Sequence, residues 1–239
     1  EAVLASMAAA AAAPGDTVVE IGPGRGALTR HLFGTARRVV AIELDEGLAA
    51  ALSQQRRGRQ GLTVITADIL RVDFPAILAE DEPERTVIVG NLPYYITSPI
   101  LRAVFAARHL FRCATFLMQE EVADRVVAAG GSRSFGFLSC LCQLQSRPEK
   151  LFCVPPAAFA PPPRVRSAAV RFDLAGEPPP AGLLSFLSAC FCQPRKTLKN
   201  NLAARYPTQL LRADRCAGMR AQQLSLDALR AMWGRLEAR

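Results

Sequence analysis

Histidine, tyrosine and tryptophan are scarce in this chain of 239 residues, which holds two, three and one of them. Histidine acid–base catalysis is therefore disfavoured, because His31 and His109 lie outside the candidate motifs described below. Long hydrophobic runs are also missing, since no apolar stretch approaches the roughly 20 residues that a membrane helix needs. The nearest is an alanine-rich run at residues 8–13, which we expect to end a surface helix before Pro14. We expect no membrane partner.

Cysteine spacing typical of a metal site or a disulfide framework is absent. The seven cysteines are odd in number and include no C-x-x-C pair, which indicates free thiols in a reducing compartment and no bound metal. We accordingly expect a cytoplasmic protein. An organelle matrix is the alternative, because the chain starts at Glu1 rather than at a methionine and a targeting segment would precede it.

Acidic residues are scarce in the last quarter of the chain. Residues 176–239 hold 10 basic and 4 acidic side chains, a difference of +6, whereas residues 1–175 hold 19 and 17, a difference of +2. A basic appendage on a nearly neutral domain is typical of a protein that binds a polyanion such as RNA. A solvated basic surface without a partner is the alternative.

Alternating strand and helix patterns predict the fold of the first 175 residues. Strands that are apolar throughout, each followed by a helical segment, indicate a parallel sheet covered on both faces. Two further strands, at residues 151–155 and 167–174, are expected to form a closing hairpin. The predicted fold is an α/β, doubly wound, Rossmann-like sheet. Its expected parallel strands are residues 17–22, 38–44, 62–68, 86–91 and 113–119.

The stretch GEPPP at residues 176–180 divides the chain, because it fits neither a helix interior nor a strand interior. Beyond it the pattern is helical, over residues 183–191, 196–206 and 224–236. We therefore predict two domains, an α/β domain over residues 1–175 and a small, basic, helical domain over residues 176–239.

Polar groups follow the first expected strand at the edge where open α/β sheets bind ligands. Glu20 leads into Gly22, Gly24 and Gly26, and glycines at such a turn let backbone N–H groups approach a ligand closely. The G-x-G-x-G spacing differs from the dinucleotide pattern G-x-G-x-x-G, and a lone glycine loop is weak support for either ligand.

The next two strands also end in acidic residues. Glu43 closes the second strand, where it is placed to accept the hydroxyl groups of a ribose, and Asp68 closes the third, where it could recognise an adenine edge. Glu20 would repel a pyrophosphate near a helix N-terminus but suits an ammonium group, as in S-adenosylmethionine. We therefore favour that methyl donor, with a dinucleotide or no ligand as the alternatives.

The segment Asn91-Leu92-Pro93-Tyr94, after the fourth strand, fits methylation of an adenine amine. The lone pair of this amine is delocalised into the ring, so a site must accept both hydrogens while the nitrogen becomes tetrahedral. We expect the side-chain carbonyl of Asn91 and the backbone carbonyl of Leu92, left free by Pro93, to accept them and so favour the transition state. Tyr94 is expected to stack on the base. An ordinary turn capped by Asn91 is the alternative.

Eight motifs spread over nearly the whole chain resemble the small-subunit rRNA adenine N6,N6-dimethyltransferase family. They are EIGPGRGALT (20–29), IELD (42–45), TAD (66–68), GNLPYYITSPIL (90–101), MQEEVADRV (118–126), VPPAAFAPPPRVRSAAVRF (154–172), QPRKTLKNNL (193–202) and MRAQQLSL (219–226). The last three are much more specific than the first. The resemblance implies a class I methyltransferase sheet, S-adenosylmethionine as the methyl donor and no metal.

The resemblance also implies roles for single residues. Phe159 matches the family's second aromatic residue beside a flipped target base, and burial under the proline loop is the alternative for it. Arg195, Lys196 and Lys199 are candidates for phosphate contacts, which add affinity but no base specificity. The residues implied to contact the cofactor are Gly22, Glu43, Asp68 and Asn91.

The implied substrate is small-subunit rRNA, in which two adjacent adenosines near the 3′ end each receive two methyl groups during ribosome biogenesis. We expect a monomer that acts on the immature small subunit. QPRKTLKNNL and MRAQQLSL argue against the related enzymes that modify large-subunit rRNA. Tyr95 stands where many family members have asparagine, and we expect this change to alter loop packing.

A non-catalytic ribosome-assembly or transcription factor that keeps the fold is the main alternative function, since a fold does not establish an activity. The intact Asn91, Pro93 and Tyr94 argue against it. A DNA adenine methyltransferase would share the acceptor chemistry, but it would not predict the C-terminal motifs.

Overall fold

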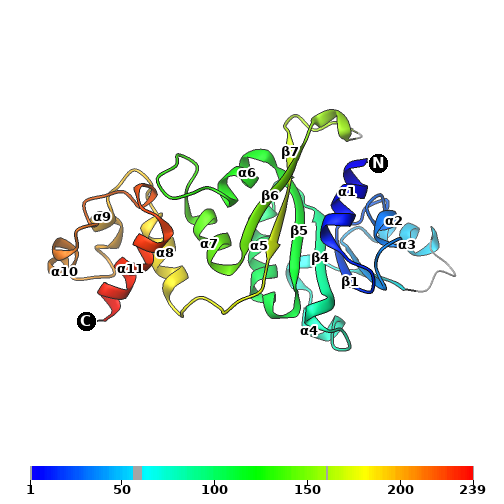
Figure 1. Ribbon diagram of the computed structural model, residues 1–239, viewed down its shortest axis with the longest axis horizontal. Coiled ribbons are helices and arrows are strands. Elements are labelled where there is room, and N and C mark those ends of the chain that lie inside the picture. The colour runs from blue at the N-terminus through cyan, green and yellow to red at the C-terminus, as the bar shows by residue number, and fades with distance from the viewer. Residues whose placement is uncertain (1, 56–60, 160, 239) are drawn as a thin grey trace. The chain divides into compact units, whose positions relative to one another are not determined.

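The computed structural model describes residues 2–55, 61–159 and 161–238. Its centre is a seven-stranded sheet with the strand order β3-β2-β1-β4-β5-β7-β6 (Figure 1). The first five strands are parallel, whereas β7 runs antiparallel to β5 and β6 runs antiparallel to β7. The predicted doubly wound sheet with a closing hairpin is thereby confirmed. The strands are β1 (Thr17–Ile21), β2 (Arg38–Glu43), β3 (Leu62–Thr66), β4 (Thr86–Asn91), β5 (Cys113–Gln119), β6 (Arg147–Val154) and β7 (Ser167–Asp173).

Burial distinguishes the central strands from the edge strand β6. Every residue of β1 is buried, as expected for a parallel strand covered on both faces. In β6, Arg147 and Glu149 are exposed and Pro148 is tolerated, because an edge strand pairs on one side alone. These polar residues explain why β6 starts four residues before the predicted position 151, where the apolar run begins.

One face of the sheet is covered by α1 (Ala2–Ala11). Met7 and Ala8 are buried in the same apolar cluster as Leu117 of β5, and the Cys113 thiol donates a hydrogen bond to the Ala11 carbonyl at 3.7 Å. The predicted surface helix that ends before Pro14 is confirmed, since Ala5 and Ala9 are exposed on its outer side, while the small alanines of its inner side let the helix pack directly on the sheet.

The opposite face is covered by α5 (Thr97–Ala106). Phe105 of this helix makes an edge-to-face contact with Phe172 of β7, with ring centroids 5.9 Å apart, and Phe172 in turn contacts Phe116 of β5. Side chains alternate along a strand, so Phe116 points away from the face that carries Leu117 and α1. The sheet is thus a middle layer between helices.

The remaining helices up to residue 126 have at most ten residues, and none of the described helices is long and apolar enough to cross a membrane. They are α2 (Thr29–Leu32), α3 (Glu46–Gln55), α4 (Phe74–Ile77) and α6 (Glu120–Val126).

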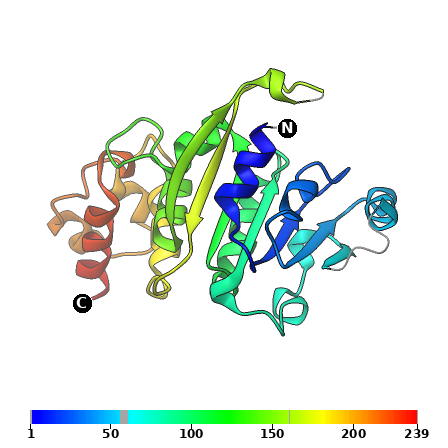
Figure 2. The same cartoon turned by 45° about the vertical axis from the view of Figure 1, so that its right-hand side comes forward.

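The β6–β7 hairpin extends beyond its neighbouring strands (Figure 2). Val154 at the end of β6 pairs with Ser167 at the start of β7, and the connection between them begins with a 3-10 turn at Pro156–Ala158. Phe159 follows this turn directly. The hairpin therefore carries the proline-rich segment to the edge of the sheet where the parallel strands end.

The chain divides into two compact units, which we call the sheet unit (residues 1–123 and 146–176) and the helical unit (residues 124–145 and 177–239). The break near residue 176 coincides with the predicted boundary, but residues 124–145 do not follow the predicted division into 1–175 and 176–239. The reason is packing: Phe135 and Cys140 are buried in one cluster with α8 and α11 residues such as Phe186 and Met232.

The helical unit contains one helix more, after residue 180, than the three predicted. The expected helix at 196–206 ends early, at Leu202, and a separate helix starts at Thr208. Pro207 explains the interruption, because it lacks an N–H group and disfavours helical geometry in the residue before it. The helices of this unit after α6 are α7 (Phe137–Gln145), α8 (Leu183–Cys190), α9 (Leu198–Leu202), α10 (Thr208–Ala213) and α11 (Leu226–Glu237).

Candidate active site

The predicted site residues meet where the strand order reverses, between β1 and β4. Both strands are neighbours in the sheet, and Ile21 pairs with Gly90, so the loop that starts at Gly22 leaves the sheet beside Asn91. On the other side of β1, Ile21 pairs with Ile42, which places Glu43 at the same edge. A topological switch point at the carboxyl ends of parallel strands is the usual ligand position in such sheets.

The glycine loop after β1 is shaped by positive φ angles. They are 63° at Gly22, 56° at Gly24 and 75° at Gly26, a region that side chains with a Cβ rarely occupy. A Cβ atom at Gly22 or Gly24 would meet no atom within 4 Å, so the backbone there borders open space. A Cβ at Gly26 would lie 2.7 Å from Leu52, which gives this glycine a packing role instead. The structure therefore separates two glycines that border open space from one that packs against the core.

Glu20 is buried beneath this loop, with 1% of its surface exposed. Its Oε2 atom has no hydrogen-bond partner among the described residues. Burial raises the pKa of Glu20 to about 7, against the lowering effect of Thr29 and with a small contribution from the negative charge of Glu43. A buried carboxyl group without a cation is costly unless it is neutral or receives a partner.

Glu43 organises the edge of the sheet through its carboxylate. Oε2 accepts a hydrogen bond from Gly24 N at 2.9 Å, and Oε1 accepts one from Asp45 N at 3.0 Å. Each carboxylate oxygen can accept a second hydrogen bond, so Glu43 can still bind hydroxyl groups while it holds the glycine loop in place.

Asp68 was predicted as a site residue from the sequence, whereas Leu44 was not. Asp68 accepts a hydrogen bond from Leu70 N at 3.0 Å and caps a short 3-10 turn, so one of its oxygens has a structural partner. Leu44, directly after Glu43, is 68% exposed, so an apolar side chain is open to solvent beside the predicted ribose contact. Sequence reasoning missed Leu44, because an apolar residue after an apolar strand was counted as the end of that strand.

The acceptor loop and the hairpin form one pocket of about 230 Å³. The loop contributes Asn91 and the three residues after it, and Phe159 contributes from the hairpin 68 positions later. Phe159 is half-buried and also packs against the sheet core. It therefore lines the pocket, as expected for an aromatic residue beside the target base, and is also partly buried, as the alternative expected. The residues that line the pocket are Asn91, Leu92, Pro93, Tyr94, Phe159, Pro161 and Pro163.

Hydrogen bonds hold the acceptor loop in place. Leu92 N donates to the Leu117 carbonyl of β5 at 2.9 Å, which orients the peptide between Asn91 and Leu92. The Tyr94 hydroxyl lies 2.9 Å from the Ser167 hydroxyl of β7 and so joins the loop to the hairpin. Tyr95 is 83% exposed and does not line the pocket, so its effect on loop packing stays a prediction.

The predicted phosphate contacts belong to the helical unit. Arg195 and Lys196 are exposed in the segment between α8 and α9, and Lys199, on α9, is half-buried. Lys199 N donates to the Ala217 carbonyl at 2.8 Å, which fixes its backbone. In the described part of the chain, no three histidine, cysteine or acidic side chains lie together as metal ligands would.

Comparison with known protein families decides the identity of this arrangement. A family model described as ribosomal RNA adenine dimethylase matches residues 3–226. The chain belongs to this family. The family match therefore covers both the glycine loop of the sheet unit and most of the helical unit.

Two curated relatives of this dimethylase cover most of its length. Both are named ribosomal RNA small subunit methyltransferase A. The relative from Acidobacterium capsulatum is 45% identical and covers 93% of this chain and 82% of its own. The relative from Bordetella petrii is 43% identical and covers 94% and 86%.

Solved structures give the fold class of the dimethylase. A dimethyladenosine transferase from Plasmodium falciparum has a TM-score of 0.79 at 24% identity, covering 97% of this chain and 94% of its own. The 23S rRNA methyltransferase ErmE has a TM-score of 0.76 at 27% identity, covering 99% and 98%. The predicted class I methyltransferase fold is confirmed.

Proposed function

We propose that the protein transfers methyl groups from S-adenosylmethionine to the N6 amines of two adjacent adenosines near the 3′ end of small-subunit rRNA, during ribosome biogenesis. The observation that carries this proposal is the pocket in which Asn91, Leu92 and Tyr94 face Phe159. The names of the curated relatives support the choice of the small subunit.

The residues at the switch point fit the proposed methyl donor. The open space beside Gly22 and Gly24 would admit the part of S-adenosylmethionine that contacts the backbone of the glycine loop. The free acceptor positions of Glu43 suit the ribose hydroxyls of the same molecule. The unpartnered Oε2 of Glu20 suits an ammonium group. When bound, S-adenosylmethionine supplies an electrophilic methyl group.

The chain's own groups would activate the amine. The exposed Asn91 ends β4, so its side-chain carbonyl can accept one amine hydrogen at the mouth of the pocket. The Leu92 carbonyl can accept the other, since among the described loop residues no backbone N–H donates to it. Both contacts strengthen as positive charge develops on the nitrogen, which lowers the barrier more than it tightens substrate binding.

Tyr94 and Phe159 would hold the base. Stacking on aromatic rings is the usual way in which an unpaired base is bound, and the target must leave its RNA stack to enter the pocket. After the first transfer the amine keeps one hydrogen, so one of the two acceptors suffices for the second methylation. The same pocket can therefore serve both steps.

We further propose a cytoplasmic monomer whose partner is the immature small ribosomal subunit. Seven free cysteines support a reducing compartment. By sequence the helical unit carries 12 basic and 5 acidic residues against 17 and 16 in the sheet unit, and this surplus suits an RNA surface.

The test is to incubate the protein with immature small subunits and labelled S-adenosylmethionine, then to digest the RNA and identify the labelled nucleoside. Dimethyladenosine from the 3′-terminal region is expected. Label in another nucleoside, or in large-subunit RNA alone, would contradict the proposed substrate. Cofactor and subunit binding without any label would favour the non-catalytic assembly factor.

A further inference from the structure

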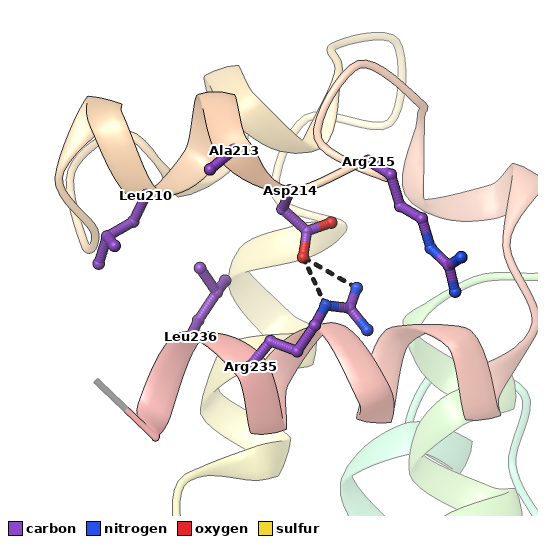
Figure 3. A pocket seen from close by; sticks show the side chains of 6 residues that line it. All are labelled: Leu210, Ala213, Asp214, Arg215, Arg235 and Leu236. Atoms are coloured by element: carbon purple, nitrogen blue, oxygen red, sulfur yellow. Dashed lines mark hydrogen bonds and ion pairs between the residues drawn. The ribbon is translucent and has the colours of Figure 1, made fainter.

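The helical unit contains a second pocket, of about 250 Å³, that the proposed reaction does not use. It lies between α10, the turn that follows α10, and α11 (Figure 3). None of the predicted phosphate contacts at positions 195, 196 and 199 lines it. Its lining residues are Leu210, Ala213, Asp214, Arg215, Arg235 and Leu236.

Asp214 builds the polar end of this pocket. Its side chain is 4% exposed, and its Oδ2 atom accepts hydrogen bonds from Nε and Nη2 of Arg235, each at 2.8 Å. Its Oδ1 atom accepts a hydrogen bond from Cys216 N at 2.8 Å, which fixes the turn that carries Arg215. The pocket is therefore organised before any ligand arrives, and preorganisation reduces the entropic cost of binding.

The two guanidinium groups keep donors for a ligand. A guanidinium has five N–H donors, and Asp214 engages two of those on Arg235. Arg215 is exposed and makes no hydrogen bond or close ion pair with the described residues. Two cations face one carboxylate, so the pocket has a net positive charge and favours an anion.

The other end of the pocket is apolar. Figure 3 shows the side chains of Leu210 and Ala213 coming from α10 and that of Leu236 from α11. The volume lies below the roughly 300 Å³ at which pockets for whole drug-sized ligands begin, so a small group with a charged end and a carbon-rich end fits best.

We propose that this pocket binds one phosphate of the RNA backbone, with Arg215 and Arg235 on its oxygens and the adjoining sugar against Leu210, Ala213 and Leu236. The inference rests on the proposed function, because that function brings RNA to the protein. Arginine forks match phosphate geometry and bind it through charge-assisted hydrogen bonds. The pocket adds a contact on the helical unit beyond the segment that carries Arg195 and Lys196.

The first test compares Arg215→Gln with the control variant Arg230→Gln, which also removes one positive charge. Arg230 is on α11, pairs with the exposed Asp227 at 3.7 Å and does not line the pocket. Binding of a 3′-terminal small-subunit rRNA fragment is measured at several salt concentrations. Arg215→Gln should make the slope of log affinity against log salt shallower by about 1. Its affinity deficit should then shrink about threefold between roughly 50 and 200 mM salt. An unchanged slope, or equal changes in both variants, overturns the proposal.

A second variant leaves the charge unchanged. Ala213 is exposed and lines the pocket, so Ala213→Leu should fill the pocket, weaken RNA binding and leave the unfolding temperature unchanged. Unweakened binding would overturn the proposal.

Free phosphate is tested separately, by replacing chloride with inorganic phosphate at constant ionic strength. Phosphate could change the affinity of the wild type for the rRNA fragment while Arg215→Gln leaves the slope of log affinity against log salt unchanged. In that case the pocket binds free phosphate and the RNA assignment is wrong. Failure of the proposed function would appear differently, as a wild type that methylates no small-subunit RNA.

Discussion

Glu20 is the residue whose surroundings differ most from those of a free side chain. It is buried at the end of a fully buried strand, and burial alone would favour its neutral form. The energetic penalty of ionising it is present in the free protein and is relieved when a cation arrives. A buried acid at a ligand edge, with one carboxylate oxygen left without a partner, is therefore interpreted as a binding group rather than a core residue.

Replacing Glu20 by glutamine should stabilise the ligand-free protein at high pH. The folded pKa of about 7 lies above the ordinary value of 4.5, so the wild type loses stability as the pH rises from 4.5 to 7. At pH 8, Glu20→Gln should raise the free energy of unfolding by up to about 3 kcal/mol, since one pKa unit corresponds to about 1.4 kcal/mol. Urea unfolding at pH 4.5 and 8 measures the difference, which should vanish at pH 4.5. The same variant should bind S-adenosylmethionine more weakly. If the variant and the wild type were equally stable at both pH values, the raised pKa assigned to Glu20 would be contradicted.

Asn91→Ala should abolish methyl transfer without unfolding the protein. The side chain is exposed and ends β4, so its removal creates no cavity in the core. Removing one preorganised acceptor from a transition state typically costs a factor of about 100–1,000 in kcat. Single-turnover transfer and thermal unfolding are measured together, and near-normal turnover would show that the acceptor mechanism is wrong.

At the scale of elements, the pocket depends on a contact between the acceptor loop and the β6–β7 hairpin. Tyr94 and Ser167 are 73 residues apart in the chain, and their hydroxyl groups form the hydrogen bond that joins the two elements. This bond fixes the position of the hydroxyl end of the tyrosine ring, and a ring held in place keeps the base aligned for transfer.

A double-mutant cycle tests this contact. Tyr94→Phe and Ser167→Ala should each lower kcat/KM about two- to tenfold, since one hydrogen bond contributes about 0.5–1.5 kcal/mol. The double variant should be no worse than either single variant, because both changes break the same bond. Methylation kinetics with saturating cofactor provide the measurement, and additive losses would mean that the two hydroxyl groups act separately.

The turn between α10 and α11 is held by Asp214. Burial would raise the pKa of Asp214, but the hydrogen bonds from Arg235 and Cys216 N and the charges of Arg235 and Arg215 lower it overall. An acid with a lowered pKa stabilises the fold above its unfolded pKa, and this stability is lost as the pH falls through the folded pKa.

Asp214→Asn should therefore lower the free energy of unfolding by about 1–3 kcal/mol at pH 7. The difference from the wild type should shrink below about pH 4, the ordinary range for an aspartate. Asp227→Asn is the matched control, because Asp227 is 91% exposed and its ion pair with Arg230 should contribute less than about 1 kcal/mol. Chemical unfolding at several pH values decides, and equal effects of both variants would contradict the structural role of Asp214.

At the scale of the whole molecule, the helical unit is built from two separate pieces of chain. Residues 124–145 enter it between β5 and β6 of the sheet, so the boundary between the units is crossed more than once. Phe135 and Cys140 are buried by helices that follow residue 176. Neither piece can therefore form this core alone.

A chain that ends at residue 176 should be insoluble or should bind a hydrophobic dye, since Phe135 and Cys140 lose their packing partners. Replacing residues 124–145 by a short glycine–serine link in the same shortened chain should restore solubility. Soluble yield, dye binding and thermal unfolding of both proteins provide the test. A cooperatively folded chain 1–176 without dye binding would mean that these residues pack with the sheet unit.

The sequence alone predicted the doubly wound sheet with its closing hairpin, the glycine loop and the acceptor loop. These features depend on short-range patterns: an apolar run specifies a buried strand, and a residue's position at a strand end places it at the ligand edge. Phe159 was located through its proline-rich motif, and the structure places it in the same pocket as Asn91.

Tertiary structure decided the features that depend on residues far apart in the chain. Four features were not predicted: the unpartnered Oε2 atom of Glu20, the bond from Tyr94 to Ser167, the inclusion of residues 124–145 in the helical unit, and the pocket at Arg215 and Arg235. Each depends on which segments pack together, and packing is a property of distance in space that local patterns do not encode. The sequence thus determined what chemistry the strand ends carry, while the folded chain decided which of those groups are buried, paired or left open to a ligand.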